Sequence, residues 1–427
     1  MDERAKRVYI HTFGCQMNEY DSERMGGELR AKGYVPVSDK KNAEYVIVNT
    51  CSVRKLAEEK AFSLIGALSA EKKVIVAGCM AQSMKEELFK KFPRLTAVVG
   101  TFKISRIAEI IENGKKRAYV DERSESYSGN IERKKEAAGF VTVMQGCDNF
   151  CSYCIVPYVR GRERSRGIEE IKEEITAMAR AGYREVTLLG QNVNSYYDKK
   201  TGLDFPELLR ETARIDGICR IKFMTSHPKD LSDELIRAVA EEEKAAKHFH
   251  LPVQSGSAAV LEKMNRRYTP ESYRERISAI RKAIPDCAIT TDILVGFPGE
   301  TNEDFEKTAA LVSDVRFDSA FVFKYSERSG TKAEAFGDDV AKEEKTRRIN
   351  YILGLQKKIS DDIIKRDEGK TVLALGLNVS SKRPGEIEMS VDSGKKVFVR
   401  GSADLIGKMV KVKLVKARGM SFEGEII

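Results

Sequence analysis

The chain has 427 residues, of which 41% are hydrophobic and 33% are charged, and its formal net charge is +9. These values are those of a globular protein with two or three domains. No apolar run is long enough to span a bilayer, and Met1–Arg7 lacks the apolar core of a signal peptide, so we expect a cytoplasmic protein without membrane contact. Eight cysteines are too few for a disulfide scaffold and would be available in a reducing compartment as metal ligands.

Three cysteines follow predicted strands in the first third of the chain. Short apolar runs alternate with amphipathic stretches over residues 1–121, which predicts an open, doubly wound α/β domain with a parallel sheet. The clearest predicted strands are Val8–Phe13, Tyr45–Thr50 and Val74–Gly78. Cys15, Cys51 and Cys79 come after these strands, and the carboxyl ends of parallel strands share the edge where such folds bind ligands. The three are candidate ligands of one metal centre; the alternative is that they are ordinary core cysteines.

The middle of the chain predicts a partial barrel behind a linker. Residues 122–138 carry many charges and few apolar side chains, which indicates a solvated linker. Residues 139–366 contain six strand-then-helix units, which predict a partial (β/α)6 barrel with its chemistry at the carboxyl ends of the strands. The expected strands are Phe140–Met144, Glu185–Leu189, Ile221–Thr225, His248–Val253, Ala288–Val295 and Ser319–Lys324.

The loop after the first of these strands carries Cys147, Cys151 and Cys154 in a C-x₃-C-x₂-C pattern. Thiolates are soft ligands that suit Fe–S clusters, zinc or copper. No fourth Cys or His follows nearby, so a closed structural zinc site is not completed locally. A 4Fe–4S cluster with one iron left open for a substrate fits this spacing best; zinc and buried core cysteines are the alternatives.

Several other residues in this domain have less specific interpretations. Cys219 and Cys287 stand at strand starts, away from the expected site, and indicate packing. His248 and His250 share one strand face without a third ligand at matching spacing, so we expect them to line the barrel. His227 lies at the functional end of a strand, but His-Pro is also common in turns, so both interpretations stay open.

Arginines just behind the cysteine loop are candidate phosphate ligands. Arg160, Arg162, Arg164 and Arg166 alternate along the chain, and their position beside the loop favours RNA contact over a solvated charge run. A second basic pair, Arg347-Arg348, lies on the helical stretch Val340–Lys365, where we expect it on the solvent-exposed face.

Residues 367–427 predict a small basic β domain. The expected strands are Thr371–Val379, Glu386–Val391, Lys395–Arg400, Val410–Ala417 and Met420–Ile426, which suit a small OB-like β-barrel. Residues 369–427 hold 11 Lys and Arg against 6 Asp and Glu. Lys411 and Lys413 fall on one strand face, and this charge favours RNA binding over a domain that only caps the barrel.

Longer segments around the cysteines resemble a known family. The pattern at Cys147–Cys154, with an aromatic residue before its last cysteine, is similar to the radical S-adenosylmethionine (SAM) motif. The longer segment Gly146–Arg166 resembles the methylthiotransferases and, among them, the MiaB-type tRNA enzymes. Thr12–Asn18, Asn49–Arg54 and Ala77–Gln82 resemble their amino-terminal motifs, and the tail resembles a TRAM domain. Phe13 and Ser152 stand where that subgroup often has Tyr and Thr.

The resemblance implies two 4Fe–4S clusters, with SAM as both methyl donor and radical source. Cys147, Cys151 and Cys154 would hold the cluster that binds SAM, and Cys15, Cys51 and Cys79 an auxiliary cluster that supplies sulfur. These six cysteines are the expected catalytic residues. The expected SAM-contacting residues at the barrel opening are Tyr153, Gly190, Gln191, Asn192, Ser226, Gln254, Ser255 and Asp292.

The implied reaction converts N6-isopentenyladenosine at position 37 of tRNA, next to the anticodon, into its 2-methylthio derivative. The expected partners are the tRNA anticodon stem-loop and an electron donor such as flavodoxin or ferredoxin, and we expect a monomer. Relatives in this family modify threonylcarbamoyladenosine or a ribosomal-protein aspartate and remain alternatives. A metal-stabilised RNA-binding protein without enzymatic activity is another, although structural zinc prefers four ligands.

Overall fold

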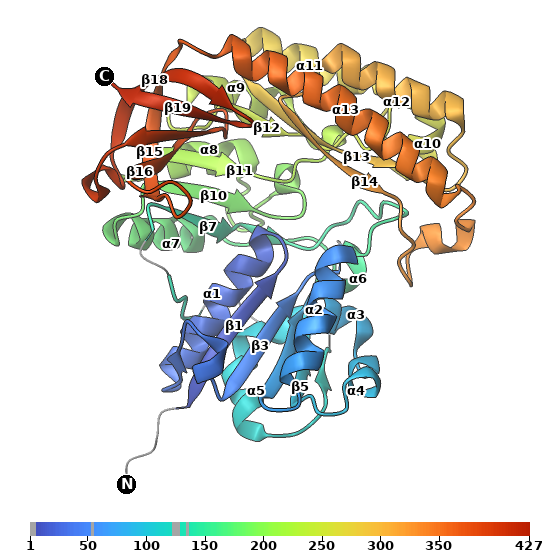
Figure 1. Ribbon diagram of the computed structural model, residues 1–427, viewed down its shortest axis with the longest axis vertical. Coiled ribbons are helices and arrows are strands. Elements are labelled where there is room, and N and C mark those ends of the chain that lie inside the picture. Colours follow the sequence, from blue (N-terminus) through green and yellow to red (C-terminus); the bar gives the residue numbers. More distant parts are fainter. Residues whose placement is uncertain (1–5, 53–54, 122–128, 134–135) are drawn as a thin grey trace. The chain divides into compact units, whose positions relative to one another are not determined.

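A computed structural model describes residues 6–52, 55–121, 129–133 and 136–427 of the chain. The chain forms two compact units (Figure 1). Unit 1 comprises residues 1–134, 145–148 and 154–164, and unit 2 comprises residues 135–144, 149–153 and 165–427. The short strands β8 (Met144–Gln145) and β9 (Arg164–Ser165) lie where the chain passes from one unit to the other.

Unit 1 contains a six-stranded, all-parallel sheet in the order β2-β1-β3-β4-β5-β6. Its strands are β1 (Arg7–Phe13), β2 (Val35–Pro36), β3 (Tyr45–Thr50), β4 (Lys73–Gly78), β5 (Ala97–Val99) and β6 (Ala118–Tyr119). Its helices are α1 (Gln16–Ala31), η1 (Lys40–Asn42), α2 (Lys55–Leu68), α3 (Cys79–Met84), α4 (Glu87–Lys91), η2 (Thr101–Arg106), α5 (Ile107–Asn113) and α6 (Val156–Arg160). The predicted doubly wound sheet is confirmed.

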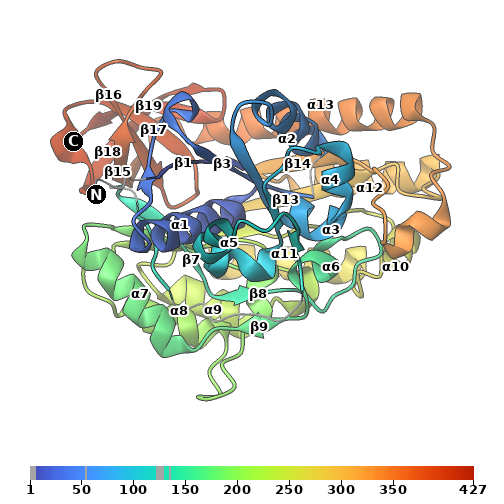
Figure 2. The same ribbon diagram turned by 90° about the horizontal axis from the view of Figure 1, so that it is seen from below.

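Helices cover both faces of this sheet because its strands are apolar on both sides. Residues of β3 alternate between two separate cores, Ile47 in one and Val48 in the other. The first core includes side chains of α1 and α5, and the second includes side chains of α2, α3 and α4. The backbone course of these helices can be followed in Figure 2. Burial on both faces is what a near-continuous run of β-branched residues in a parallel strand predicts.

The predicted linker, residues 122–138, is described only in part: residues 122–128 and 134–135 lie outside the described residues. The described stretch 129–133 is hydrogen-bonded to α1. The Asn130 amide donates to Glu28 Oε1 at 2.9 Å, and Arg133 Nη1 donates to Glu23 Oε2 at 2.6 Å. Two glutamates of α1 therefore hold this stretch in place within unit 1.

Unit 2 contains the predicted partial barrel. Its parallel strands form two sheets, in the orders β11-β10-β7 and β12-β13-β14. An isolated parallel bridge between Ile221, on β11, and Ala245, just before β12, connects them. The strands are β7 (Ala138–Thr142), β10 (Glu185–Leu189), β11 (Arg220–Phe223), β12 (His248–His250), β13 (Ala288–Val295) and β14 (Ser319–Lys324). The helices are α7 (Ile168–Arg180), η3 (Val193–Ser195), α8 (Phe205–Ala213), η4 (Pro228–Asp230), α9 (Asp233–Glu241), α10 (Ala258–Lys263), α11 (Pro270–Ala283), α12 (Asn302–Val315), η5 (Lys332–Phe336) and α13 (Lys342–Arg366).

The C-terminal part of unit 2 is a closed five-stranded barrel in the order β15-β16-β17-β19-β18, as predicted. Its elements are β15 (Thr371–Val379), β16 (Glu386–Val391), β17 (Lys396–Arg400), η6 (Ala403–Leu405), β18 (Met409–Arg418) and β19 (Ser421–Ile426). Along β18, Val412 and Leu414 are buried while Lys411 and Lys413 are exposed. The alternation of the sequence therefore separates a barrel core from a cationic outer face.

One basic pair differs from expectation. Arg348, on α13, is 4% exposed and bonds to Glu300 Oε1 at 2.6 Å, so it is not on the solvent-exposed face. A buried guanidinium requires such a carboxylate partner. Arg347 is exposed, as predicted.

Among the residues that the structure describes, no helix is both long and apolar enough to cross a membrane.

Candidate active site

Cys15 and Cys51 flank the topological switch point of the unit 1 sheet, and Cys79 follows the next strand. The strand order places β1 and β3 side by side although β2 intervenes in sequence, and ligands bind at such points. Cys15 follows β1, Cys51 follows β3, and Cys79 begins α3 directly after β4. Burial raises the pKa of the Cys79 thiol to about 12; Arg160 lowers this pKa, and Cys51 and Cys15 raise it further. Because β1, β3 and β4 are adjacent parallel strands, the cysteines that follow them lie at one edge of the sheet.

Two buried asparagines hold this edge together. Asn18 donates from Nδ2 to Asn49 Oδ1 at 3.2 Å, and Asn49 donates from Nδ2 to the Asn18 carbonyl at 2.8 Å. Asn18 Oδ1 also accepts from the Cys15 amide at 3.4 Å. The pair ties the start of α1 to the end of β3 and so fixes the spacing between Cys15 and Cys51. Their role was not foreseen from the sequence, since it depends on a contact between distant segments.

The second cysteine loop turns sharply at Gly146, which has a φ of +86°. The Cys147 amide donates to the Gly161 carbonyl at 3.1 Å. A Cβ on Gly146 would lie 2.0 Å from the Arg162 carbonyl oxygen. Only glycine combines this left-handed conformation with so close a backbone approach.

We expect Gly146→Ala to displace the loop and lower iron incorporation at Cys147, Cys151 and Cys154. The added methyl group would both strain the backbone and collide with a carbonyl that cannot rotate away. Iron and sulfide analysis after anaerobic reconstitution measures the loss. Gly167→Ala is the matched control, because Gly167 has no atom within 4 Å of its Cβ position and an ordinary φ of −63°. Equal iron contents in the two variants would contradict this account.

Cys151 belongs to the stretch of the loop in unit 2, where several hydrogen bonds fix the backbone. Asn265 Nδ2 donates to the Phe150 carbonyl at 3.0 Å, and Phe150 itself has a φ of +47°. Ser152 Oγ donates to the Lys263 carbonyl at 2.8 Å, a bond that threonine could equally make. Arg266, which is 5% exposed, donates from Nη1 to Cys151 Sγ at 3.4 Å.

Polar groups without partners gather at the carboxyl ends of the unit 2 strands. Among the described residues, no hydrogen-bond partner is present for the buried polar side-chain atoms Asn194 Oδ1 and Nδ2, Ser226 Oγ, His227 Nε2 and Tyr325 Oη. These residues follow β10, β11 and β14. Thr225 and Gln254, which follow β11 and β12, have φ values of +73° and +66°, a strained conformation that is concentrated at binding sites. Buried polar atoms in a native protein are normally bonded, so this set fits a polar ligand such as SAM.

His227 is thereby placed among the site residues. Its Nδ1 accepts from the Lys229 amide at 3.3 Å, so its Nε2 carries the hydrogen. Burial lowers the pKa of His227 to about 2, with Arg266 and Lys229 adding to the effect, so the ring stays neutral. His248 and His250 instead both bond to Thr290 Oγ1, at 2.9 and 3.0 Å, as the barrel-lining prediction implies.

The predicted SAM-contacting residues differ in what their side chains already bind. Asn192 bonds to Asp230 at 2.7 Å and Ser255 to Thr308 at 3.2 Å, so both side chains support the scaffold. Gly190 packs so closely on Met144 that a Cβ would lie 2.5 Å from its Cγ. Gln191 follows β10 and Gln254 follows β12, whereas Asp292 lies within β13 and Tyr153 lies on the cysteine loop. Asp292 Oδ1 is 3.5 Å from His250 Nε2, and the Tyr153 ring lies edge-on to Phe297.

Two of the four predicted RNA-contacting arginines require correction. Arg160 is 2% exposed and pairs with Asp21 at 2.6 Å, and Arg166 is 6% exposed and pairs with Glu174 at 2.7 Å. Side chains buried against carboxylates do not reach RNA phosphate. Arg162 is exposed beside Asp148, and Arg164 lies over the Phe102 ring; RNA contact by these two stays a prediction.

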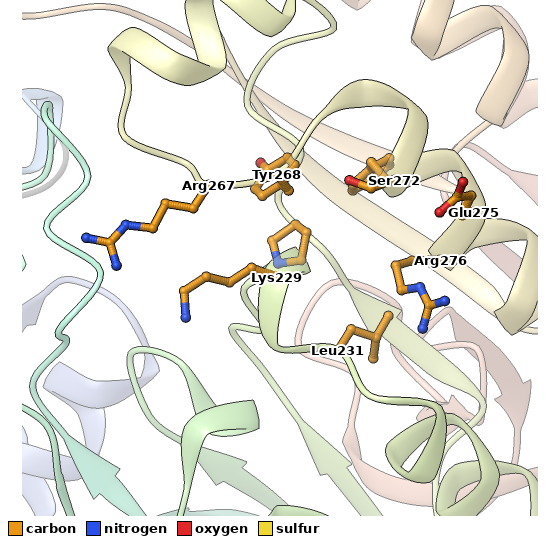
Figure 3. Close-up of a pocket in the computed structure, with 9 residues that line it drawn as sticks. Lys229, Leu231, Arg267, Tyr268, Ser272, Glu275 and Arg276 are labelled. Atoms are coloured by element: carbon orange, nitrogen blue, oxygen red, sulfur yellow. The ribbon is translucent and has the colours of Figure 1, made fainter.

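A basic pocket that the sequence did not indicate lies beside the β11 end. It has a volume of about 310 Å³, and Lys229, Arg267 and Arg276 contribute its cations against Glu275 (Figure 3). Figure 3 shows the Lys229 and Arg267 side chains extending to the same side. Arg267 forms no ion pair with any described residue. Lys229 pairs with Asp230 and Arg276 with Asp233, so Arg267 is the cation of this pocket that suits a phosphate group.

All eight cysteines are free thiols. Within the described ranges, no three His, Cys, Asp or Glu side chains are spaced to hold a single metal ion. A four-iron cluster binds each cysteine through a different iron, so its ligands stand farther apart than those of one ion. Arg160 Nη1, buried beside Cys79 without a described partner, adds an unpaired donor that the sulfur atoms of a cluster would satisfy. The residues present therefore fit Fe–S clusters better than zinc.

Comparison with known proteins identifies the family. Residues 141–312 match the radical SAM superfamily, and residues 7–100 match an uncharacterized protein family, UPF0004. The chain is 45% identical over 434 residues to the tRNA-2-methylthio-N(6)-dimethylallyladenosine synthase of Clostridium botulinum (strain Okra / Type B1), covering 98% of this chain and 96% of that protein. The chain belongs to this synthase family. The Thermodesulfovibrio yellowstonii synthase is likewise 45% identical, with 99% of each chain covered.

Solved structures agree with this assignment at the level of fold. The radical SAM methyltransferase TsrM from Kitasatospora setae, solved with cobalamin and a [4Fe-4S] cluster, aligns over 75% of each chain with a TM-score of 0.55 and 13% identity. The cobalamin-dependent radical SAM enzyme OxsB aligns over 83% of this chain and 56% of its own, with a TM-score of 0.51 and 12% identity. Membership of the radical SAM superfamily implies a 4Fe–4S cluster and SAM for this synthase-family chain.

Proposed function

We propose that this chain methylthiolates N6-isopentenyladenosine (N6-dimethylallyladenosine) next to the anticodon of tRNA. The observation that carries the proposal is the position of Cys15, Cys51 and Cys79 after three adjacent parallel strands, in a chain related over its whole length to synthases of that name. This set is separate in sequence from the loop of Cys147, Cys151 and Cys154. When bound, SAM and two 4Fe–4S clusters supply the radical, the methyl group and the sulfur.

The role of the protein is to bind, orient and exclude water. Cys147, Cys151 and Cys154 hold one cluster, and the bonds from Asn265 and Ser152 keep their loop fixed. Within unit 1, Ile155, the neighbour of Cys154, packs against Cys79. This contact places the residue next to Cys154 against Cys79 within unit 1. Ser226 Oγ and the neutral His227 Nε2–H offer one hydroxyl and one donor to SAM or the adenine.

Cationic groups on both parts of unit 2 suit the phosphates of an anticodon stem-loop. Lys411 and Lys413 face outward from the C-terminal barrel, and Lys229 and Arg267 extend from the pocket beside β11. Phosphate neutralisation dominates the affinity of proteins for RNA. The proposal includes a flavodoxin or ferredoxin as electron donor, because SAM cleavage consumes an electron. It also includes a cytoplasmic location, because tRNA is a cytoplasmic substrate, and a monomeric state.

Mass spectrometry of tRNA nucleosides tests the proposal. The chain is reconstituted anaerobically with iron and sulfide, then incubated with SAM, a reductant and tRNA that carries either isopentenyladenosine or threonylcarbamoyladenosine. We expect the 2-methylthio product only from the first tRNA. Product from the second tRNA alone would assign the threonylcarbamoyladenosine alternative. A chain that binds zinc without iron would instead support the non-enzymatic alternative.

We expect Lys411→Gln together with Lys413→Gln to weaken tRNA binding and to reduce its salt dependence. Each lost phosphate contact lowers the slope of log affinity against log salt by about 1, so the double variant loses about 2. Fluorescence anisotropy with labelled tRNA over a salt series measures this slope. Lys357→Gln with Lys358→Gln on α13 is the control, since it removes the same charge from another surface. Equal slopes for both variants would exclude the C-terminal barrel from RNA contact.

A further inference from the structure

Arg160 occupies an unusual position among the cysteines of unit 1. It is the last residue of α6 and is 2% exposed. Its Nη2 donates to Asp21 Oδ2 at 2.6 Å, and its Nε donates to Cys79 Sγ at 3.3 Å. Its Nη1 is buried and has no hydrogen-bond partner among the described residues.

A purely structural ion pair does not account for this arrangement. Asp21 balances the charge of the guanidinium, but a buried donor without an acceptor is unfavourable. Burying the pair is itself costly unless the remaining donors are also satisfied. One donor already points to a cysteine sulfur, and the unpaired donor belongs to the same planar group. The missing acceptor therefore lies beside Cys79, where no described side chain supplies it.

We propose that Arg160, held in place by Asp21, is a positioning residue that donates hydrogen bonds to the auxiliary 4Fe–4S cluster and thereby raises its reduction potential. This inference rests on the proposed function, because it takes Cys15, Cys51 and Cys79 as the ligands of that cluster. The thiolate of Cys79 accepts one bond, and a sulfide of the cluster is the acceptor for the other. Asp21 fixes the plane of the guanidinium.

The predicted effect follows from charge. Reduction adds an electron to the cluster, and a nearby cation with N–H donors stabilises the more negative state. Hydrogen bonds to ligand sulfur act in the same direction, and the buried setting strengthens both effects. Removing the guanidinium therefore lowers the potential, while lysine keeps the charge but loses the forked donors.

A second buried arginine provides a matched control. In unit 2, Arg266 donates to Cys151 Sγ at 3.4 Å, while its Nη2 donates to the Pro252 carbonyl at 2.8 Å and its Nε to Tyr268 Oη at 2.9 Å. It thus contacts a cysteine of the other set with most of its donors satisfied. In a chain that lacks Cys151, replacing Arg266 removes a buried guanidinium from unit 2 and leaves the hydrogen bonds at Cys79 unchanged, so it controls for the loss of a buried cation.

The test uses the full chain in which Cys147, Cys151 and Cys154 are all changed to alanine, so that only the auxiliary cluster assembles. Arg160→Gln, Arg160→Lys and Arg266→Gln are compared in this background by iron and sulfide analysis and by potentiometric titration followed by EPR. We expect Arg160→Gln to lower the ratio of reduced to oxidised cluster at a fixed potential at least tenfold, which corresponds to a reduction potential lower by about 59 mV for a one-electron couple. We expect Arg160→Lys to shift the reduction potential less than Arg160→Gln does, and Arg266→Gln to leave the reduction potential unchanged.

Each outcome decides between explanations. If the parent background holds no iron, the proposed function fails at its auxiliary cluster. If iron is bound and the potentials of both Arg160 variants equal that of the parent, the present inference is overturned. Loss of iron in both Arg160 variants with unchanged thermal unfolding of the apo chain supports the assignment. Loss of iron together with a lower unfolding temperature of the apo chain would make the pair merely structural.

Discussion

Cys147→Ala abolishes cleavage of SAM, whereas Cys51→Ala preserves that cleavage and stops methylthiolation. This is the expected result if the two cysteine sets perform different tasks. Cys147 lies on the loop whose pattern matches the radical SAM superfamily, within residues 141–312. Cys51 lies at the switch point of the unit 1 sheet, in the region 7–100 that a different family pattern covers. Chromatography of 5′-deoxyadenosine measures the first activity, and nucleoside mass spectrometry measures the second.

Cys219→Ala is the control for both activities. Cys219 stands just before β11, at the opposite end of the strand from Ser226, and is a free thiol like the others. We expect both products at the level of the unsubstituted chain. If Cys51→Ala abolished SAM cleavage together with methylthiolation while binding the iron of one cluster, the separation of roles would be wrong.

Much of the architecture could be predicted because it depends on local patterns. Tyr45–Thr50 and Val74–Gly78 are apolar on both faces, so they had to be interior strands of a covered parallel sheet, as β3 and β4 are. The alternation around Lys411 and Lys413 indicated a strand with one buried face in the same way. Cysteines placed after such strands then meet at one edge by topology alone.

The arginines could not be assigned in this way because their partners are distant in sequence. Arg160 pairs with Asp21, 139 positions away, and Arg348 with Glu300, 48 positions away. A basic run looks the same in sequence whether it faces solvent or a buried carboxylate. The strained φ of Thr225 is similarly invisible, since threonine gives no local signal for a left-handed conformation.

Another distant pairing joins the partial barrel to the C-terminal barrel within unit 2. Arg220, on β11, is 1% exposed. Its Nε donates to Asp392 Oδ1 at 2.7 Å, and its Nη1 donates to the Ser390 carbonyl at 2.9 Å and approaches Glu185 Oε2 at 3.4 Å. Burial raises the pKa of Glu185, but Lys222 and Arg220 together hold this pKa below its ordinary value.

We expect Arg220→Met to lower the free energy of unfolding by about 3–5 kcal/mol, because it leaves the buried Glu185 carboxylate with less compensation. Urea unfolding of the apo chain by far-UV circular dichroism measures this, since the chain has no tryptophan. Arg214→Met is the control: Arg214 pairs with Glu211 but is 74% exposed, so its loss costs at most about 1 kcal/mol. Because the pKa of Glu185 is lowered in the folded chain, its ionised form stabilises the fold at neutral pH, and this stabilisation is lost as the pH falls through that pKa. The difference in the free energy of unfolding between Arg220→Met and the unsubstituted chain should therefore become smaller in acid. If this difference stayed constant at pH values below the ordinary pKa of glutamate, the Glu185 contact would not be its source.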